Sequence, residues 1–291
     1  MAPLSPTVAR RELMLRIGRR RKQNDVSVSA IAKELGFSIS YWSKVEKERV
    51  LAESKLDELM KLLDFDAAER EELHELRDIA RQRGWWTSYS GLLSDEISRL
   101  YGLEHGADSV RTYESILIPG LLQTADYARA LIANDRARIR QVEIERLVEI
   151  RLRRQQRLQG PDPLRVTAIV NEAALTQQIG GPEVMFDQVR HLATLLEEHM
   201  DTIDLRIIPF EATGGGLLGG ATFHLLGFDK SVPPDVAWTE TLVHHGVIED
   251  TEPVRHLDTL FANAMAEQAL SREESFAALK RKMSGASGGA R

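Results

Sequence analysis

The stretch from Val26 to Glu46, VSVSAIAKELGFSISYWSKVE, constrains the fold more than any other part of the 291-residue chain. Ser27 is a residue type that caps helix N-termini, and the apolar residues after it have the spacing of one helix face. These apolar residues are Val28, Ile31, Ala32 and Leu35. Gly36 follows them, where a helix commonly ends in a left-handed conformation. The pattern predicts a short helix that stops at a tight glycine turn.

A second short helix is expected directly after this turn. Ser38 is its predicted cap, and Trp42 and Val45 are its predicted inward residues. Two short helices joined in this way form a helix-turn-helix, although an ordinary helical pair in an all-α protein uses the same caps and spacing. The expected outward face consists of Ile39, Ser40, Tyr41, Ser43, Lys44 and Lys47. Hydroxyls and lysines near a helix N-terminus suit the DNA major groove, which favours DNA binding.

The net charge of the chain is −6, but it is unevenly distributed. Residues 1–47 contain ten Lys or Arg and four Asp or Glu, a net charge of +6, and the remainder has a net charge of −12. Such asymmetry indicates a nucleic-acid-binding end carried by an acidic body. The predicted partner is therefore double-stranded DNA.

Composition excludes several other classes of protein. The chain has no cysteine, which excludes disulfide, zinc-thiolate and cysteine-nucleophile chemistry. We see no signal peptide and no apolar run of membrane-spanning length, because Pro119-Gly120 interrupts the most apolar stretch. We expect a cytoplasmic protein that does not bind membranes.

Further helices are expected around the central pair. Thr7 is the predicted cap of the first, which runs to about Asn24. Its basic end includes Arg19 and Arg20, which we expect on DNA phosphates unless they are simply solvated surface. The others are expected at residues 52–63 and from Asp66, which forms a capping-box pair with Glu69, until Gly84 stops the helix. Five helices would form an all-α N-terminal domain over residues 1–83.

The second domain is predicted at residues 84–283 and has a different pattern. Strands are expected at residues 110–118, 164–170, 204–210, 221–228 and 235–241. Helices are expected at residues 94–103, 123–133, 143–159, 182–200, 253–270 and 271–283. This order predicts an α+β domain, and residues 284–291, SGASGGAR, are predicted to be a flexible tail.

The N-terminal stretch resembles the helix-turn-helix of XRE-type regulators. The matching positions are Ala32, Gly36, Ser38, Tyr41 and Glu46. Val28 departs from the pattern, because many members carry there a glutamine that contacts phosphate or supports the reading helix. The resemblance also implies a structural brace between Arg21 and Glu46 that does not contact DNA.

The C-terminal part resembles a domain found in a large group of actinobacterial XRE-type regulators, described as antitoxin-like or of unknown function. The most specific block is Ile118-Pro-Gly-Leu-Leu-Gln-Thr124. Weaker matches follow in order at residues 127–130, 153–155, 171–175, 180–188 and 208–209. The resemblance implies a transcriptional regulator, often paired with a small partner protein, and does not identify an effector.

Signs of catalysis are weak. Gly214 to Gly219 satisfies G-x-G-x-x-G, but strand-forming residues follow it where a dinucleotide site needs a helix, so a loop between strands explains it better. His244 and His245, with Glu240 and Glu249 nearby, approach metal-ligand spacing only if they share a helix, which Gly246 opposes. We therefore predict no catalytic residue, no metal and no cofactor.

Two other groups of residues have alternative interpretations. The arginines of residues 151–157 could form a second phosphate-binding face, but i,i+4 pairing such as Glu149 with Arg153 on a solvated helix is simpler. Tyr113, Tyr127 and Trp238 could line a small-molecule pocket, although such aromatics more often belong to a core.

The sequence predicts a DNA-binding transcriptional regulator, not an enzyme, that acts as a homodimer. Recognition is assigned to Ser38, Ser40, Tyr41, Ser43 and Lys44. Phosphate contacts are assigned to Arg19, Arg20 and Lys47. The second domain would sense an unidentified small-molecule effector or a partner. The alternatives are an antitoxin-like protein that binds a small partner protein and autoregulates and, with less support, a nucleotide-binding enzyme.

Overall fold

The computed structural model describes residues 2–47, 49–217, 220–228, 234–241 and 244–287. The described chain divides into two compact units, one formed by residues 3–88 and the other mainly by the residues from Tyr89 onward. The fold class is confirmed, because the first unit is helical and the second contains helices and a mixed sheet. Each unit has its own hydrophobic core.

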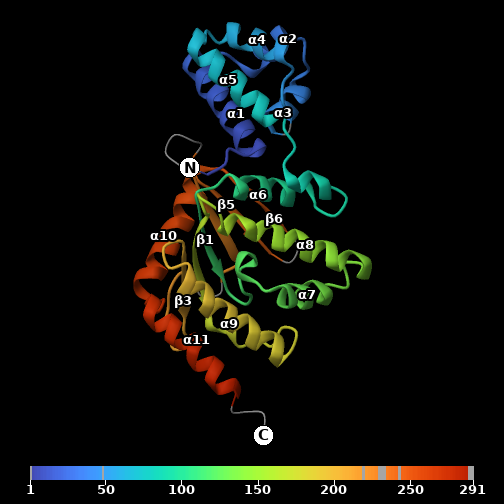
Figure 1. Cartoon of the computed structure of the whole chain (residues 1–291). Coiled ribbons are helices and arrows are strands. Elements are labelled where there is room, and N and C mark those ends of the chain that lie inside the picture. The colour runs from blue at the N-terminus through green and yellow to red at the C-terminus, as the bar shows by residue number, and fades with distance from the viewer. Residues whose placement is uncertain (1, 48, 218–219, 229–233, 242–243, 288–291) are drawn as a thin grey trace. The chain divides into compact units, whose positions relative to one another are not determined.

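The N-terminal unit contains five α-helices among its described residues (Figure 1). They are α1 (Pro6–Gln23), α2 (Val28–Leu35), α3 (Ile39–Lys47), α4 (Glu53–Leu62) and α5 (Ala67–Ala80). Their apolar faces share one core, in which Leu13, Ile31, Trp42 and Leu56 are all almost completely buried. The inward positions expected from the spacing, Trp42 and Val45 of α3 included, are therefore confirmed.

Local capping residues set the helix ends. Ser27 caps α2, and Asp66 forms the expected capping box with Glu69 at the start of α5, with both hydrogen bonds at 2.9 Å. The predicted cap of α1 was wrong, because Ser5 and not Thr7 accepts the hydrogen bond, from the Val8 amide at 3.2 Å. Pro6 can then occupy the first helical position, where the missing N–H is harmless.

The second unit is built on a six-stranded sheet with the order β3-β2-β1-β4-β5-β6. The strands are β1 (Ser109–Glu114), β2 (Arg165–Asn171), β3 (Ile203–Ile208), β4 (Thr222–Gly227), β5 (Val236–Glu240) and β6 (His245–Ile248). β1, β2 and β3 are parallel and are connected through helices. β4, β5 and β6 continue the sheet antiparallel on the other side of β1.

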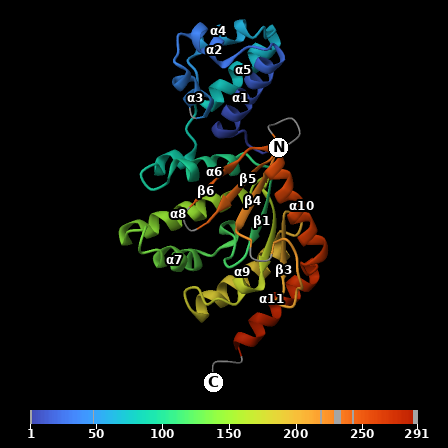
Figure 2. The ribbon, with the colours of Figure 1, turned by 180° about the vertical axis from the view of Figure 1, so that it is seen from behind.

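Helices cover both faces of this sheet, as the two opposite views show (Figures 1 and 2). One side carries α6 (Asp95–His105), α7 (Ala125–Asn134) and α8 (Ile144–Gln155). The other side carries α10 (Thr251–Glu267) and α11 (Arg272–Ser287). α9 (Pro182–Glu198) connects β2 to β3 and packs against α11. Because side chains alternate along a strand, the two faces of β1 have different environments.

The face of the sheet beneath α10 is apolar. Tyr113 of β1 and Phe223 of β4 are neighbours in register, and their rings pack with Phe261 of α10 in one buried cluster. The opposite face carries the alternate residues of the same strands, including Thr112 and Glu114, which are both buried. This second face is unusually polar for an interior.

Several expected boundaries differ from the structure. The long helix expected at residues 143–159 is shorter, because α8 covers residues 144–155 and a 3₁₀ turn continues to Leu158. β6 was not predicted, since its four residues are all only partly buried and show no alternation. α11 extends to Ser287, so residues 284–287 of the predicted flexible tail are helical. The remaining tail residues, 288–291, lie outside the described residues.

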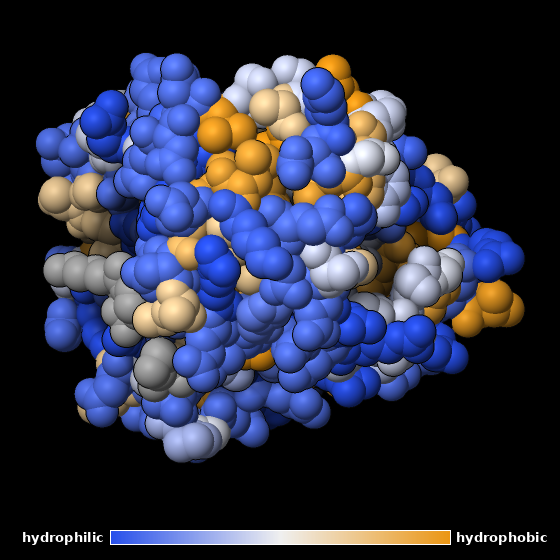
Figure 3. All heavy atoms as spheres, turned by 90° about the horizontal axis from the view of Figure 1, so that it is seen from above, coloured by the Kyte–Doolittle hydropathy of each residue, from blue (hydrophilic) through white to orange (hydrophobic). Residues whose placement is uncertain are grey.

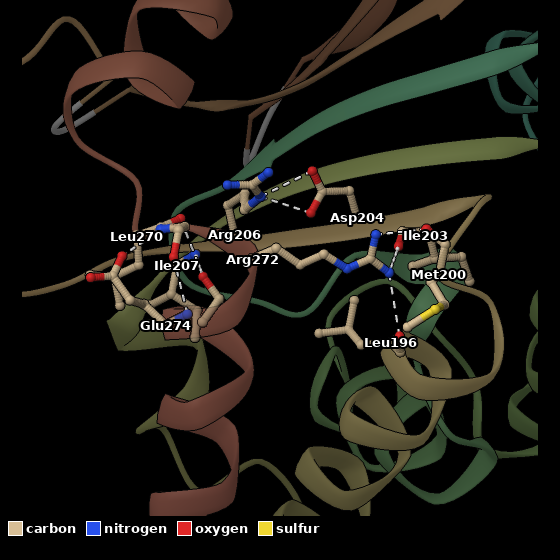
Figure 4. Close-up of polar contacts among 11 residues, drawn as sticks. Leu196, Met200, Ile203, Asp204, Arg206, Ile207, Leu270, Arg272 and Glu274 are labelled. Carbon is tan, nitrogen blue, oxygen red and sulfur yellow. Dashed lines mark hydrogen bonds and ion pairs between the residues drawn. The ribbon is translucent and has the colours of Figure 1, made fainter.

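The outer edge of the sheet at β3 is closed by the segment that leads into α11 (Figure 4). The Leu270 amide donates to the Ile207 carbonyl at 2.9 Å, and the Ile207 amide donates to Ser275 Oγ at 3.1 Å. The Arg272 guanidinium donates to the carbonyl of Ile203 at 3.1 Å, and also to the carbonyls of Leu196 and Met200 at the end of α9. This edge is therefore not a free template for another strand.

The face of the molecule drawn in Figure 3 is mainly hydrophilic, with hydrophobic residues gathered in separate patches. Among the described residues, eight large hydrophobic side chains are exposed. Two of the eight, Ile39 and Tyr41, belong to α3. No helix of the described chain is long and apolar enough to cross a membrane.

Candidate nucleic-acid interface

The turn between α2 and α3 is fixed by backbone hydrogen bonds and by a glycine. Gly36 has a φ of 69°, in the left-handed region that favours glycine. This conformation lets the Phe37 amide donate to the Ala32 carbonyl at 2.7 Å and the Gly36 amide donate to the Lys33 carbonyl at 3.2 Å. The end of α2 is thereby satisfied and the chain reverses into α3. The predicted helix-turn-helix is confirmed as a local structure.

α3 begins with the expected serine cap. Ser38 Oγ accepts a hydrogen bond from the Tyr41 amide at 3.1 Å, and it lies 3.0 Å from Ser40 Oγ. The Ser38 hydroxyl therefore holds the first turn of the helix. Because the Ser38 hydroxyl already bonds to the Tyr41 amide and to Ser40, it is less able to bond to a base.

The outward face of α3 is largely as the spacing predicts. Ser40, Tyr41 and Lys44 are exposed, whereas Ser43 is half-buried. The Tyr41 ring packs on the Phe37 ring at a centroid distance of 4.7 Å, and the Arg49 guanidinium lies 5.2 Å above it. The side chain of Lys47 lies outside the described residues. The exposed hydroxyls, the aromatic ring and the lysine form one surface along the helix.

The two arginines at the basic end of α1 differ: Arg19 is exposed, whereas Arg20 is bonded to other parts of the unit. Arg19 is exposed, as a phosphate contact requires. Arg20 pairs with Glu69, donates to the Asp64 carbonyl at 2.8 Å and lies 4.5 Å above the Phe65 ring. Arg20 thus ties α1 to the segment before α5, and its contact with phosphate stays a prediction.

The brace implied between Arg21 and Glu46 is not formed. The Arg21 guanidinium instead donates to the Val26 carbonyl at 3.2 Å, which joins the end of α1 to the segment before α2. Glu46 is exposed, and its backbone carbonyl accepts a hydrogen bond from Arg10 at 3.4 Å. α1 and α3 are therefore joined by the hydrogen bond from Arg10 to the Glu46 carbonyl and not by the predicted ion pair.

In the second unit, Arg154 of α8 and Arg157 of the 3₁₀ turn after it do not belong to a solvated or phosphate-binding face. The Arg154 guanidinium makes two hydrogen bonds with the Glu104 carboxylate of α6, at 2.7 and 2.9 Å, and both side chains are less than 10% exposed. Burial acts most strongly and lowers the pKa of Arg154, but the charge and hydrogen bonds of Glu104 together with those of Tyr101 outweigh it and raise that pKa above its usual value. Arg157 donates to the carbonyls of His105 and Ala107. Both earlier interpretations of this cluster were wrong for these two residues.

The PGLLQT block is held by its own Gln123 and by side chains from two helices, α8 and α9. Gln155 of α8 donates to the carbonyls of Gly120 and Gln123, at 3.1 and 2.8 Å. Gln123 donates to the Ile118 carbonyl at 2.7 Å and accepts from Arg151 at 2.7 Å. Gln188 of α9 bonds to the backbone of the block at both Leu122 and Thr124. These polar groups of the block therefore make hydrogen bonds within the domain and are not directed to a ligand.

Comparison with known families covers both units. A family model described as a helix-turn-helix domain matches residues 12–73. A second model, described as a domain of unknown function (DUF5753), matches residues 97–281, which is more than half of the chain. The chain belongs to the DUF5753 family. Searches of the curated proteins and of the solved structures each gave no match.

The DUF5753 region has a buried polar layer between its sheet and α8. Thr222 donates to the Glu114 carboxylate at 2.7 Å, and the Thr112 hydroxyl lies 2.7 Å from Nδ1 of His224. Burial raises the pKa of Glu114 to about 7, with nearby Glu240 acting in the same direction. Burial also lowers the pKa of His224 to about 4. No local pattern predicted this layer, because its members come from separate strands.

The other candidate residues of the DUF5753 region have structural roles. Tyr113, Tyr127 and Trp238 are completely buried, as expected of core residues. The glycine-rich segment leads into β4 and not into a helix, although its residues 218–219 lie outside the described ones. His245 lies on β6 opposite Glu240 of β5. Among the described residues, no three His, Cys, Asp or Glu side chains are grouped as a metal site.

Proposed function

We propose that this chain is a sequence-specific DNA-binding transcriptional regulator of the XRE type, and not an enzyme. The observation that carries the proposal is the capped turn at Gly36, which presents the exposed face of α3 beyond a buried base of Trp42 and Val45. The match of residues 12–73 to a helix-turn-helix model supports it. Action on DNA also implies the expected cytoplasmic location.

In this proposal α3 enters the major groove. An α-helix fits that groove, and side chains near its N-terminus reach the base edges. We assign base contacts to Ser40, Tyr41, Ser43 and Lys44. Arg19 at the end of α1 and Lys47 at the end of α3 are assigned to phosphates. Ser38 and Arg20 are assigned to the fold, because their polar groups are engaged within it.

The distribution of charge supports the same mode of binding. Residues 1–47 have a net charge of +6, and the rest of the chain has a net charge of −12. Phosphates attract the first part and repel the second. DNA is therefore bound through the helix-turn-helix unit, with little nonspecific binding elsewhere.

A single α3 supplies few base contacts, each worth roughly 1–3 kcal/mol when bidentate. We therefore propose a homodimer that places two α3 helices on half-sites about one helical turn apart. The DUF5753 region would then carry the regulatory input, an effector or a protein partner. Purification from the native host distinguishes the two inputs: a stoichiometric small protein supports the antitoxin-like alternative, and a bound metabolite supports sensing.

The main test begins with DNA fragments selected by the full-length protein. Lys44→Ala is expected to weaken binding to the best selected site by roughly 1–3 kcal/mol and to change binding to random DNA much less. The measurement is the Kd for both DNAs at fixed salt concentration. Equal affinity of the wild type and Lys44→Ala for the selected site would refute the role of α3 in recognition.

Two neighbouring arginines supply a matched control. Arg19→Ala is expected to weaken binding to all sequences and to reduce the salt slope by about 1, because one phosphate contact is lost. Arg20→Ala is expected to lower the thermal stability of the N-terminal unit while the folded protein keeps the salt slope of the wild type. If Arg20→Ala and not Arg19→Ala changed the slope, the assignment of the two residues would be reversed.

A further inference from the structure

The first residue of α3 is an exposed isoleucine. Ile39 is 60% exposed, more than any other large hydrophobic side chain of the N-terminal unit that the structure describes. It follows the Ser38 cap, where the side chain stands at the N-terminal end of the proposed reading helix. Single exposed apolar side chains are common, but this one stands on the face of α3 that the proposed function places in the major groove, where covering it would be favourable.

The hydroxyl of Ser38, just before Ile39, is already engaged. The Ser38 hydroxyl accepts the Tyr41 amide, and the Ser40 hydroxyl lies 3.0 Å from that of Ser38. On the same helix face, the next residue after Ile39 is Ser43, one turn further along. The largest exposed surface in the first turn of α3 is therefore apolar, although the face as a whole is hydroxyl-rich.

We propose that Ile39 contacts the 5-methyl group of a thymine in the major groove and so selects thymine at one position of the bound site. This inference rests on the proposed DNA-binding function and names a base that the site reads. Thymine is the only standard base that presents a methyl group in that groove. Cytosine presents an amino group at the neighbouring position, which an isoleucine cannot pair with.

The side chain suits this contact for two further reasons. Isoleucine is β-branched, and in a helix one χ1 rotamer is strongly preferred, so little rotamer freedom is lost when the methyl group is covered. Tyr41 is held between Phe37 and Arg49, which fixes the shape of the surface next to the first turn. The protein surface that would meet the methyl group is therefore largely ordered before DNA binds.

The test replaces thymine with uracil, which removes only the methyl group. In the best selected site, each thymine is replaced in turn by deoxyuridine, and the Kd of the full-length protein is measured. We expect about a fourfold increase in Kd at one position of each half-site, the size expected for burial of one carbon group. Replacement at the other positions is expected to leave the Kd unchanged.

Protein variants assign the effect to Ile39. Ile39→Ala is expected to bind the thymine and uracil sites equally, whereas Glu46→Ala, a control on the same helix whose exposed side chain is assigned no DNA contact, keeps the fourfold difference. Melting curves show whether Ile39→Ala is folded, which is expected because the side chain is exposed. Ile39→Val, which keeps a β-branched contact, is expected to retain part of the difference.

The outcomes separate this inference from the proposed function. Selective DNA binding without any thymine–uracil difference overturns the inference and leaves the function standing. A difference that persists in Ile39→Ala also overturns it, because another residue or the DNA shape then senses the methyl group. Failure to select any DNA sequence refutes the proposed function itself.

Discussion

The buried pair of Arg154 and Glu104 is expected to be essential to the stability of the second unit. Arg154→Met removes the cation and its two hydrogen bonds to Glu104, whose side chain is only 6% exposed. The carboxylate is then left charged in a site with little water. Breaking a buried pair of this kind costs roughly 3–5 kcal/mol. We therefore expect the free energy of unfolding of this unit to fall by about that amount.

The loss of stability comes from the buried charge of Glu104 that is left without a partner, so it depends on whether Glu104 is also replaced. Replacing both residues together, as Arg154→Met with Glu104→Leu, is expected to cost much less than Arg154→Met alone, because a buried ion pair is often no more stable than apolar side chains of similar volume. Arg153→Met is the matched control: the neighbouring arginine is exposed, and a surface substitution is expected to stay within about 0.5 kcal/mol.

Urea unfolding followed by circular dichroism measures these differences, and hydrogen exchange of peptides from α6 and α8 assigns the transition to the second unit. A cost of Arg154→Met no larger than that of Arg153→Met would refute the reasoning. It would show that the α8 arginines are solvated after all, as the charge pattern of the helix suggests.

Two further outcomes concern pH and the helix-turn-helix. The folded state raises the pKa of Glu114 from 4.5 to about 7, so it binds this proton more tightly than the unfolded state does, and the Glu114 contribution to the free energy of unfolding should fall by about 3 kcal/mol as pH rises through this range. The lowered pKa of His224 acts in the opposite direction between about pH 4 and 6.5, so the fall is expected in the difference between the wild type and Glu114→Gln. Urea unfolding at several pH values measures the fall, and an unchanged pH profile in Glu114→Gln would contradict its assignment to this group. Gly36→Ala should lower the Tm of the N-terminal unit through about 1–2 kcal/mol of backbone strain, whereas Gly18→Ala, also with no atom within 4 Å of the added Cβ, should raise it; equal effects would contradict the strain.

The parts of the fold that were predictable from sequence depend on local information. Ser27, Gly36 and the Asp66–Glu69 capping box act within a few residues of their own position, so their residue types suffice to place the helix ends. The inward positions of the helices follow from spacing for the same reason. β6 was missed because its residues are all half-buried and lack the alternation that indicates a strand.

The contacts of Arg20 and Arg154 were not predicted for a common reason, which is distance along the chain. Arg20 was expected on phosphate because its acceptors, Asp64 and Glu69, lie more than 40 residues away. Arg154 was interpreted as surface because Glu104 lies 50 residues before it. A charged side chain has the same letter whether it is solvated or buried with a partner, so only the tertiary structure distinguishes these roles.

The internal bonding of the PGLLQT block changes what the block can be used for. Gln123, Gln155 and Gln188 donate hydrogen bonds to backbone carbonyls of this segment. The residues of the block therefore determine how β1 is connected to α7, and they do not specify a ligand. Proteins that contain this block would share the same local structure and could still respond to unrelated signals. Assigning an effector to one member would therefore say little about the next, and each needs its own experiment.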